Sequence, residues 1–333
     1  MNPSVPEVRD NAARPIVGHG IPAAMGRPSA TGAEASDDTL PKRVVNSGEL
    51  EGDRESAPMW TLTGFADEIS PDVDEQVDTL AQDDIRWLEL RGAWGKNVLD
   101  LSDEDLAVLK RNLENVGIRV SSIGSPIGKI PITDPFAPHL ARFQRALETA
   151  NLLGAPYIRV FSFFIPEGDD PADHADEVMA RMTTLAHAAE MSGITLLHEN
   201  EKHIFGDTPA RCLQILETVD SPALRAAWDP ANFVQCGVRP FAEGYEALRP
   251  FIAYVHVKDA LLAGGQVVPA GTGDGEWRET ISALHASGFD GFFSLEPHLL
   301  KAETYAGFSG PDLWRTASHA FKALLREQRI DWA

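Results

Sequence analysis

The segment ITLLHENEKH, residues 194–203, joins an apolar run to a dense group of polar side chains. Its first part, with β-branched and aliphatic residues, is typical of a buried strand. The polar part contains two glutamates, an asparagine, a lysine and two histidines. Because burying an unpaired carboxylate is costly, these groups are expected at an opening, where water, a metal ion or a substrate can satisfy them.

The same pattern recurs along the chain from Trp60 onward, as short apolar runs that alternate with longer amphipathic stretches. This alternation predicts eight strands, at 61–66, 85–92, 118–125, 157–164, 194–199, 224–229, 252–259 and 291–296. It predicts helices between and after the strands, at 72–83, 102–116, 134–153, 171–192, 208–219, 242–250, 276–287 and 311–328.

Local signals support these helices and define the fold class. Ser102 and Asp105 have the spacing of an N-terminal capping pattern, and glycines stand where C-terminal caps are expected, at 117, 154, 193 and 288. Strict alternation of strand and helix implies a parallel sheet, and eight units within about 250 to 270 residues match a closed (β/α)₈ TIM barrel. An open doubly wound sheet is the alternative, but no G-x-G-x-x-G turn follows the first strand.

Residues 1–59 differ from the rest in being rich in Pro, Gly, Ala, Ser and acids without a sustained period. Such a composition buries too little apolar surface to order, so we expect a disordered, low-complexity tail; a docking arm is the functional alternative. Met59 directly precedes the first expected strand and is a candidate translation start. The expected organisation is therefore a tail at 1–59 and one barrel domain at 60–333.

The formal net charge of −21 at pH 7 argues against polyanionic partners. Binding to nucleic acid or to an anionic membrane rests on lysine and arginine, which are in deficit here. No apolar stretch reaches the roughly 20 residues that span a bilayer, and residues 1–20 lack the apolar centre of a secretory signal, so we expect a cytoplasmic protein. Cys212 and Cys236 lack the spacing of a metal site and are interpreted as ordinary thiols.

Four consecutive predicted strands carry metal-binding side chains near their carboxyl ends, where the active sites of such barrels lie. They are Glu199 on the fifth, Asp229 on the sixth in AAWDPAN, His256 on the seventh in YVHVKDA and Glu296 on the eighth in FSLEPHL. Alternate side chains of a strand point to opposite faces, and this alternation allows all four to converge in the lumen.

Three converging carboxylates repel one another, so the cluster must take up protons or bind a cation. Three oxygen donors and one histidine suit a single Mn²⁺ ion best, with Mg²⁺, Co²⁺ or Zn²⁺ as alternatives. The competing interpretation is that each residue is a separately paired strand-end group. Their succession on four neighbouring strands favours the metal site.

From about Thr61 to Leu299 the chain resembles the xylose-isomerase-like TIM barrel superfamily of sugar phosphate isomerases and epimerases. The resemblance is carried by LLHEN, AWDPANF, YVHVKDA with the following PAGTGDGEW, and SLEPH. It implies that the four residues named above bind one Mn²⁺-type ion and that Glu199 and Glu296 also move protons. It further implies a small-molecule carbohydrate substrate and a homo-oligomer, with a hetero-oligomer as the alternative.

At two places this sequence differs from the pattern of the superfamily, and the differences bear on which members it resembles in function. Members acting on ketoses often have a histidine three residues after the aspartate of the sixth strand, where this chain has Asn232. The absence of this histidine argues against the mode of substrate binding found in the epimerases. The endonuclease branch needs further histidines for several zinc ions, one of them near VVPAGTG, where Val267 and Val268 stand. Together with the acidic charge, this argues against DNA repair.

The expected chemistry is proton abstraction next to a metal-chelated carbonyl, which gives an enediolate. Glu199 and Glu296 remove and return the proton on opposite faces in this hypothesis, and each is expected to have a pKa raised toward neutrality. The predicted function is therefore isomerisation or epimerisation of a ketose or related carbohydrate.

Two other functions use the same residues. If a leaving group lies β to the carbanion, the site eliminates it, which makes the protein a lyase or dehydratase of a keto-sugar, keto-inositol or 3-oxo-glycoside, alone or within a complex. A non-catalytic sugar-binding barrel is the third hypothesis. The matched pair of candidate bases disfavours it, because binding alone does not require them.

Further polar residues are predicted to contact the substrate: Lys258, Glu201, Asn232, His298, Lys129 and Arg159. The alternative for Lys258 is a salt bridge to Asp259 or Glu201. For the loop residues the alternative is a solvated side chain, and for the strand arginine it is an ion pair. Glu89 and Arg91, on the second predicted strand, are interpreted as a buried ion pair with each other.

Overall fold

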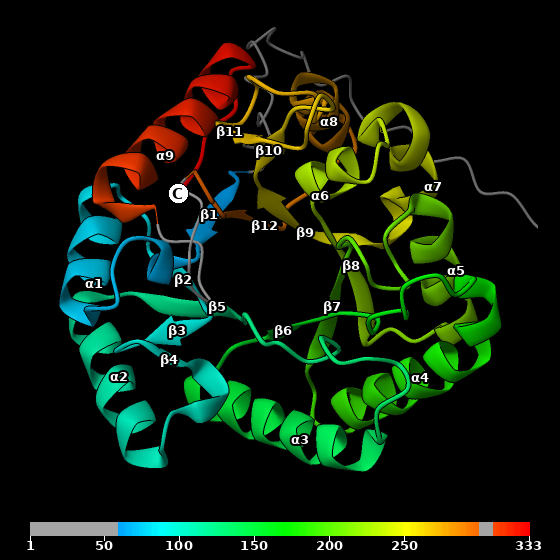
Figure 1. The fold of residues 1–333 in the computed structure, drawn as a ribbon. Coiled ribbons are helices and arrows are strands. Elements are labelled where there is room, and N and C mark those ends of the chain that lie inside the picture. The colour runs from blue at the N-terminus through cyan, green and yellow to red at the C-terminus, as the bar shows by residue number, and fades with distance from the viewer. Residues whose placement is uncertain (1–58, 300–308) are drawn as a thin grey trace, which may run out of the picture. The chain divides into compact units, whose positions relative to one another are not determined.

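Eight parallel strands form a barrel with helices on its outside (Figure 1). The structure, a computed structural model, describes residues 59–299 and 309–333. The barrel strands are β1 (Thr61–Gly64), β2 (Trp87–Leu90), β5 (Arg119–Ile123), β6 (Tyr157–Val160), β7 (Thr195–Glu199), β8 (Leu224–Trp228), β9 (Ile252–Val257) and β12 (Phe292–Leu295). The predicted (β/α)₈ barrel is thereby confirmed. Apart from Met59, the tail predicted at 1–59 lies outside the described residues.

The strands are hydrogen-bonded in the order β1-β12-β9-β8-β7-β6-β5-β2. Each neighbouring pair in this order is parallel. The two strands at the ends of the order, β1 and β2, lie side by side, so the ring is nearly closed. Parallel pairing brings the carboxyl ends of the strands to one rim of the barrel, which is the rim that carries active sites in this architecture.

Helices follow the strands and cover the outside of the ring (Figure 1). They are α1 (Val73–Gln82), α2 (Asp103–Val116), α3 (Phe136–Leu153), α4 (Ala175–Met191), α5 (Pro209–Val219), α6 (Pro230–Gln235), α7 (Glu246–Leu248), α8 (Trp277–Ala286) and α9 (Gly310–Glu327). Single turns of 3₁₀ or π helix lie at Ala66–Glu68, Val98–Asp100, Pro171–His174, Phe241–Tyr245 and Arg249–Phe251. None of the described helices is long and apolar enough to cross a membrane.

Two small hairpins extend the loops at the rim. They pair β3 (Gly92–Ala93) with β4 (Lys96–Asn97), and β10 (Asp259–Ala260) with β11 (Val267–Val268). The hairpins and the short α6 were not predicted, because each is too short to show a periodic pattern.

The caps indicated by the sequence are present at α2 and α3. The Ser102 hydroxyl accepts a hydrogen bond from the Asp105 backbone N–H, and the Asp105 carboxylate accepts one from the Ser102 N–H. Gly117 and Gly154 end the two helices in the left-handed conformation, with φ of 72° and 71°. A side chain is strained at such angles, so these glycines allow the chain to leave each helix for the next strand.

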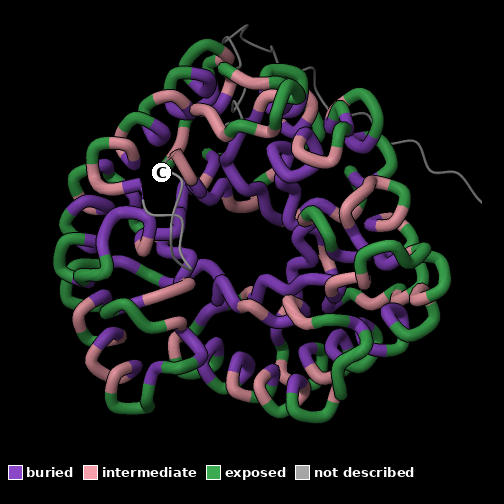
Figure 2. Tube along the Cα trace, in the orientation of Figure 1, coloured by how far each residue is buried: buried purple, intermediate pink, exposed green. Residues whose placement is uncertain are grey.

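The sheet separates two apolar regions, and buried residues line the strands while the outer helix faces are exposed (Figure 2). Val255 and Val257 belong to the larger region, between the sheet and the helices. Leu197, Ala227 and Tyr254 form a small cluster inside the barrel. Side chains of β9 therefore alternate as expected for a strand, with Tyr254 inward and the two valines outward.

Several strands end earlier than expected at the rim. The second ends at Leu90 instead of 92, the third at Ile123 instead of 125, and the fourth at Val160 instead of 164. Beyond these points the loops bond to one another, as in the hydrogen bond of 2.8 Å from the Phe161 N–H to the Ile127 carbonyl. Apolar loops that pack together have the composition of strands, so the sequence pattern could not separate the two.

Candidate metal centre and active site

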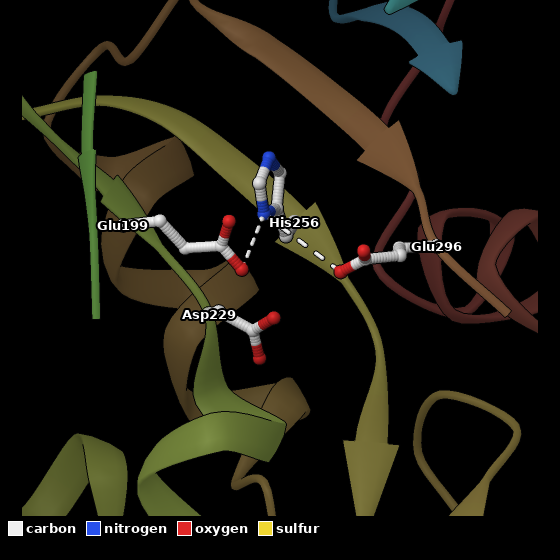
Figure 3. Close-up of side chains that lie close together, drawn as sticks. All are labelled: Glu199, Asp229, His256 and Glu296. Atoms are coloured by element: carbon white, nitrogen blue, oxygen red, sulfur yellow. Dashed lines mark ion pairs between the residues drawn. The ribbon is translucent and has the colours of Figure 1, made fainter. Parts of the chain in front are cut away.

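Glu199, Asp229, His256 and Glu296 meet at the rim of the barrel (Figure 3). One potential ligand atom from each lies within 4.8 Å of those from the other three, and all four residues are buried. His256 Nδ1 is 3.2 Å from Glu199 Oε1 and 4.0 Å from Glu296 Oε2. The fold therefore brings together the four residues that the sequence analysis selected.

The ends of regular elements hold these side chains. Glu199 is the last residue of β7, and Glu296 directly follows β12. Asp229 follows β8 and is the N-cap of α6, where its Oδ1 accepts a hydrogen bond of 2.9 Å from the Asn232 N–H. One oxygen of Asp229 is thus used to start a helix, and the other, Oδ2, is left for the cluster.

Three buried polar atoms of the cluster, Glu199 Oε2, Asp229 Oδ2 and His256 Nδ1, form ion-pair contacts of 2.9 to 3.3 Å but no well-aligned hydrogen bond with the described residues. Leaving such atoms unsatisfied is costly, and native structures rarely do so without a reason. A single divalent cation satisfies carboxylate oxygens and an imidazole nitrogen together, since both are common ligands of Mn²⁺, Mg²⁺ and Zn²⁺. The donor set therefore fits one such ion.

Two protein cations also lie against the carboxylates of the cluster. Lys258 Nζ is 2.9 Å from Asp229 Oδ2 and 2.8 Å from Glu296 Oε2. Arg159 Nη1 is 3.3 Å from Glu199 Oε2 and 3.9 Å from Glu296 Oε1. Both cations are buried; Arg159 lies on β6, and Lys258 directly follows β9.

Burial alone raises the pKa of each carboxyl here, and the neighbouring charges decide the outcome. Around Glu199 the imidazole and the guanidinium outweigh burial and lower its pKa to about 2. Lys258 is the main cation that holds the pKa of Glu296 well below its usual range. The pKa of Asp229 is raised to about 6, because burial and repulsion by the two glutamates outweigh Lys258.

The expectation that Glu199 and Glu296 have raised pKa values is therefore wrong. The physical reason is the set of cations that reaches the two glutamates. The sequence indicated that the carboxylates are buried and repel one another, and both effects raise a carboxyl pKa. It did not show which cations contact the two glutamates.

Lys129 and Glu201, both predicted to contact a substrate, pair with each other at the barrel mouth. Lys129 Nζ is 3.2 Å from Glu201 Oε2 and 4.2 Å from the centre of the Phe161 ring. The lysine side chain keeps 34% of its exposure. The alternative interpretation, a salt bridge from Lys258 to Asp259 or Glu201, is wrong, because Lys258 pairs with carboxylates of the cluster instead.

Asn232 is buried and holds two strand ends together. Its Nδ2 donates to Glu199 Oε1 at 3.1 Å and to the Asn200 carbonyl at 2.9 Å. The Asn200 side chain in turn donates to the Asp229 carbonyl at 2.8 Å and accepts from the Asp229 N–H at 3.0 Å. Asn200 was missed by the sequence analysis, although it stands next to Glu199 in the segment that opened it.

His298 lies at the rim, with Nε2 2.8 Å from Glu68 Oε1 and 3.5 Å from Glu296 Oε1. Arg91 joins the same network, because its guanidinium contacts Asp67 at 2.7 Å, Glu68 at 2.9 Å and Glu296 at 3.2 Å. This arginine therefore connects the loop after β1 to the cluster.

The predicted ion pair between Glu89 and Arg91 is wrong. The strand β2 ends at Leu90, so the Arg91 side chain belongs to a loop and does not follow the parity of Glu89. Its acidic partners, Asp67 and Glu68, lie in the 3₁₀ turn that follows β1 and were not selected from the sequence. The signal that could have found them is the one used for the other strands, acids immediately after an apolar run.

Asp259 fixes the loop beyond Lys258. Its carboxylate accepts backbone N–H bonds from Ala260 at 2.8 Å, Gly271 at 2.9 Å, Gly273 at 2.9 Å and Gly275 at 2.8 Å. A Cβ on Gly273 or Gly275 would lie 2.5 or 2.7 Å from Asp259 Oδ1. The glycines of GTGDG thus allow the backbone to wrap closely around one buried carboxylate.

Comparison by sequence identifies relatives of this chain. The family model described as xylose isomerase-like TIM barrel matches residues 77–324. A 2-epi-5-epi-valiolone 7-phosphate 2-epimerase from Actinoplanes sp. (strain ATCC 31044 / CBS 674.73 / SE50/110) is 30% identical over 198 residues. These residues cover 59% of this chain and 71% of the relative.

Solved structures share the fold at low identity. A D-tagatose 3-epimerase-like protein matches with a TM-score of 0.66 and 17% identity, over 81% of this chain and 98% of the other. The IOLI protein, solved with a bound zinc atom, matches with a TM-score of 0.66 and 16% identity, over 80% of this chain and 98% of the other. With the family match and the epimerase relative, these comparisons show that the chain is an enzyme of the xylose isomerase-like TIM barrel family.

Proposed function

We propose that this enzyme is a divalent-metal-dependent epimerase or isomerase of a ketose or related carbohydrate. The observation that carries the proposal is the convergence of Glu199, Asp229, His256 and Glu296 within 4.8 Å on one rim. The sequence relative named above is an epimerase, which favours proton transfer at carbon as the reaction class. Mn²⁺ is the proposed ion, with Mg²⁺, Co²⁺ and Zn²⁺ as alternatives.

The two glutamates have the arrangement that this reaction needs. Glu199 and Glu296 approach from opposite sides of His256 (Figure 3). Glu199, Asp229, His256 and Glu296 would hold the divalent ion, whose positive charge would polarise a carbonyl and acidify the neighbouring C–H. We assign Glu199 and Glu296 to the two proton transfers, one removing the proton and the other returning it on the opposite face of the substrate.

Lys258 and Arg159 are assigned to substrate oxygen atoms. Each now contacts a proton-carrying glutamate, and each helps to hold the pKa of that glutamate low. A substrate oxygen that takes up either cation weakens this effect and raises the glutamate pKa toward the range suited to proton transfer. Substrate binding and activation of the base are thus coupled through the same two cations.

The mouth residues are assigned to the distal part of the substrate. Lys129 and Glu201 offer a cation and an acceptor beside the Phe161 ring, and His298 offers a further polar group next to Glu296. Asn232 is assigned to holding Glu199, since its amide already donates to that carboxylate. These assignments predict selectivity for a polyhydroxyl chain longer than the reacting fragment.

The test is incubation of the Mn²⁺-loaded enzyme with ketoses, ketose phosphates and oxidised glycosides in D₂O. Deuterium at one carbon of recovered substrate, together with an epimer or isomer, is the expected result. Loss of water or of an aglycone without deuterated substrate would instead assign the site to a lyase. No reaction with any member of the panel, from protein that demonstrably holds the ion, would contradict an enzyme of this substrate class.

A further inference from the structure

Glu89 is a buried carboxylate inside the barrel that the proposed reaction does not use. It lies on β2 with a side chain that is 0% exposed. A bulge in the β2–β5 ladder precedes it: Leu88 pairs with Val120, but Glu89 pairs with Ser122, so β5 carries one extra residue. Bulges of this kind re-aim a side chain and are common next to active sites.

Two ionisable side chains lie next to Glu89, those of His256 and Tyr254. His256 Nε2 is 3.2 Å from Glu89 Oε2, and both side chains are fully buried. Among the described residues no lysine or arginine forms an ion pair with Glu89. A buried carboxylate needs compensation for its lost hydration, and the Nε2–H of His256 supplies it here, beside the Tyr254 hydroxyl, whose pKa the Glu89 charge helps to raise.

The imidazole of His256 therefore lies between two kinds of acid. Its Nε2 faces Glu89, and its Nδ1 faces Glu199 and Glu296 in the cluster. The Phe65 ring packs against it edge-on, with ring centres 5.3 Å apart, which restricts rotation of the imidazole. An imidazole with its proton on Nε2 has its free lone pair on Nδ1.

We propose that Glu89 is the positioning residue of the metal centre: it accepts the Nε2–H of His256 and so presents the Nδ1 lone pair to the ion. The inference rests on the proposed metal-dependent function. Outer carboxylates that orient a ligating histidine fix its tautomer and raise its basicity, and their loss typically lowers metal affinity by about 10- to 100-fold. Glu89 therefore acts on the ion through His256, without contacting it.

The test compares Zn²⁺ affinity of the full-length protein and its variants, measured by competition with a chromophoric chelator. Glu89→Gln keeps the shape but removes the charge, and is expected to weaken Zn²⁺ binding by about 10-fold. Glu89→Leu removes the acceptor, and is expected to approach a 100-fold loss. Ser294→Ala is the matched control, because Ser294 is buried at the level of His256 on the neighbouring strand and should leave affinity unchanged.

A second readout separates positioning from a general effect on folding. In the Zn²⁺-loaded protein, ¹⁵N NMR should place the His256 proton on Nε2, and this signal should shift or broaden in both Glu89 variants. Circular dichroism and melting of the metal-free proteins report the fold, and the Glu89→Gln variant serves if the leucine variant does not fold. Unchanged Zn²⁺ affinity and an unchanged His256 signal in folded Glu89→Gln would overturn the inference.

Failure of the proposed function gives a different result. Wild-type protein that takes up neither Zn²⁺ nor Mn²⁺ would refute the metal centre itself. Wild-type protein that binds the ion tightly, beside Glu89 variants that bind it equally well, would refute only the role of Glu89.

Discussion

The two halves of the barrel rim differ in chemistry. The half formed by β7, β8, β9 and β12 carries the three carboxylates and the imidazole of the cluster. The half formed by β1, β2, β5 and β6 carries Arg91, Arg159 and Lys129, which reach acids at or above the lumen. We call the first the ligand half, after its candidate metal ligands, and the second the cation half. Cations of both halves lower the pKa of Glu199 and Glu296: His256 and Lys258 from the ligand half, and Arg159 and Arg91 from the cation half.

Lys258 is an exception to this division. It directly follows β9, in the ligand half, but it is a cation and contacts Asp229. Without these cations, three buried carboxylates in contact would be protonated in part. The charge state of the cluster therefore depends on residues from both halves of the barrel. Its parts can therefore be tested separately.

Removal of the divalent ion should have the largest effect, and it tests whether the ligand half binds a metal that the reaction needs. Dialysis against a strong chelator should abolish deuterium exchange into substrate, because the charge that acidifies the C–H is lost. Adding back Mn²⁺ should restore the rate, which mass spectrometry of the recovered sugar measures. Full exchange by protein shown by elemental analysis to be metal-free would remove the metal from the mechanism.

Loss of a proton carrier should have the next largest effect. Glu296→Gln is expected to lower kcat by about 10³-fold, since a positioned acid–base group contributes roughly 10² to 10⁴. Metal content, measured alongside, distinguishes loss of the proton carrier from loss of the ion. The control is Glu217→Gln, an exposed acid on α5, which should keep full activity. An active Glu296→Gln enzyme would reassign the proton transfer.

Arg159 tests the cation half. Arg159→Met should raise KM by about 30-fold, which corresponds to roughly 2 kcal/mol for a hydrogen bond to a charged group. The pH dependence of kcat/KM should also move to higher pH, because a cation that lowers the pKa of Glu199 is gone. Arg225→Met is the control, since Arg225 lies on β8 and bonds to backbone carbonyls of Ser221 and Leu224 away from the cluster. Equal effects of the two variants would refute a specific role.

The smallest expected effect concerns the loop that carries Lys129. Burial, helped by Arg142 and Arg181, lowers the pKa of His139 to about 4, and its Nε2 accepts the Gly128 N–H at 2.8 Å. A histidine whose folded pKa is depressed stabilises the fold fully above its unfolded pKa of about 6.5, and this stability is lost as the pH falls toward 4.

The loss between pH 6.5 and 4 should be about 1 to 2 kcal/mol after discounting for the remaining exposure of the ring. Urea unfolding at a series of pH values measures it. His198, whose pKa burial also lowers to about 4, contributes in the same direction. The His139→Gln variant keeps an acceptor for the loop and should show a flatter pH profile than the wild type. Identical profiles would contradict the prediction.

The convergence of Glu199, Asp229, His256 and Glu296 could be predicted from the sequence because each of them lies on a strand or directly after one. Strand parity then decides the direction of the side chain, as it did for His256 and Lys258. The cation half was harder, since Arg91 lies in a loop, Asp67 and Glu68 lie in a 3₁₀ turn, and no simple period governs either. Glu89 was assigned the wrong partner for a related reason, because its true partner, His256, lies on a strand remote in the sequence.

The fold itself was predictable because eight repeats of one pattern reinforce each other, whereas single contacts between remote side chains leave no such repetition. The pKa values of Glu199 and Glu296 depend on these contacts. They could be obtained only from the arrangement in space.

The four amide bonds to the Asp259 carboxylate have a consequence for ligand binding. They order the segment that follows Lys258 when the chain folds, so that less conformational entropy of this segment is left to be lost when a ligand binds. A neutral or shorter side chain at this position would transfer that entropy cost to the binding step. Asp259 thus makes this loop rigid in advance, although it is not one of the four residues of the cluster.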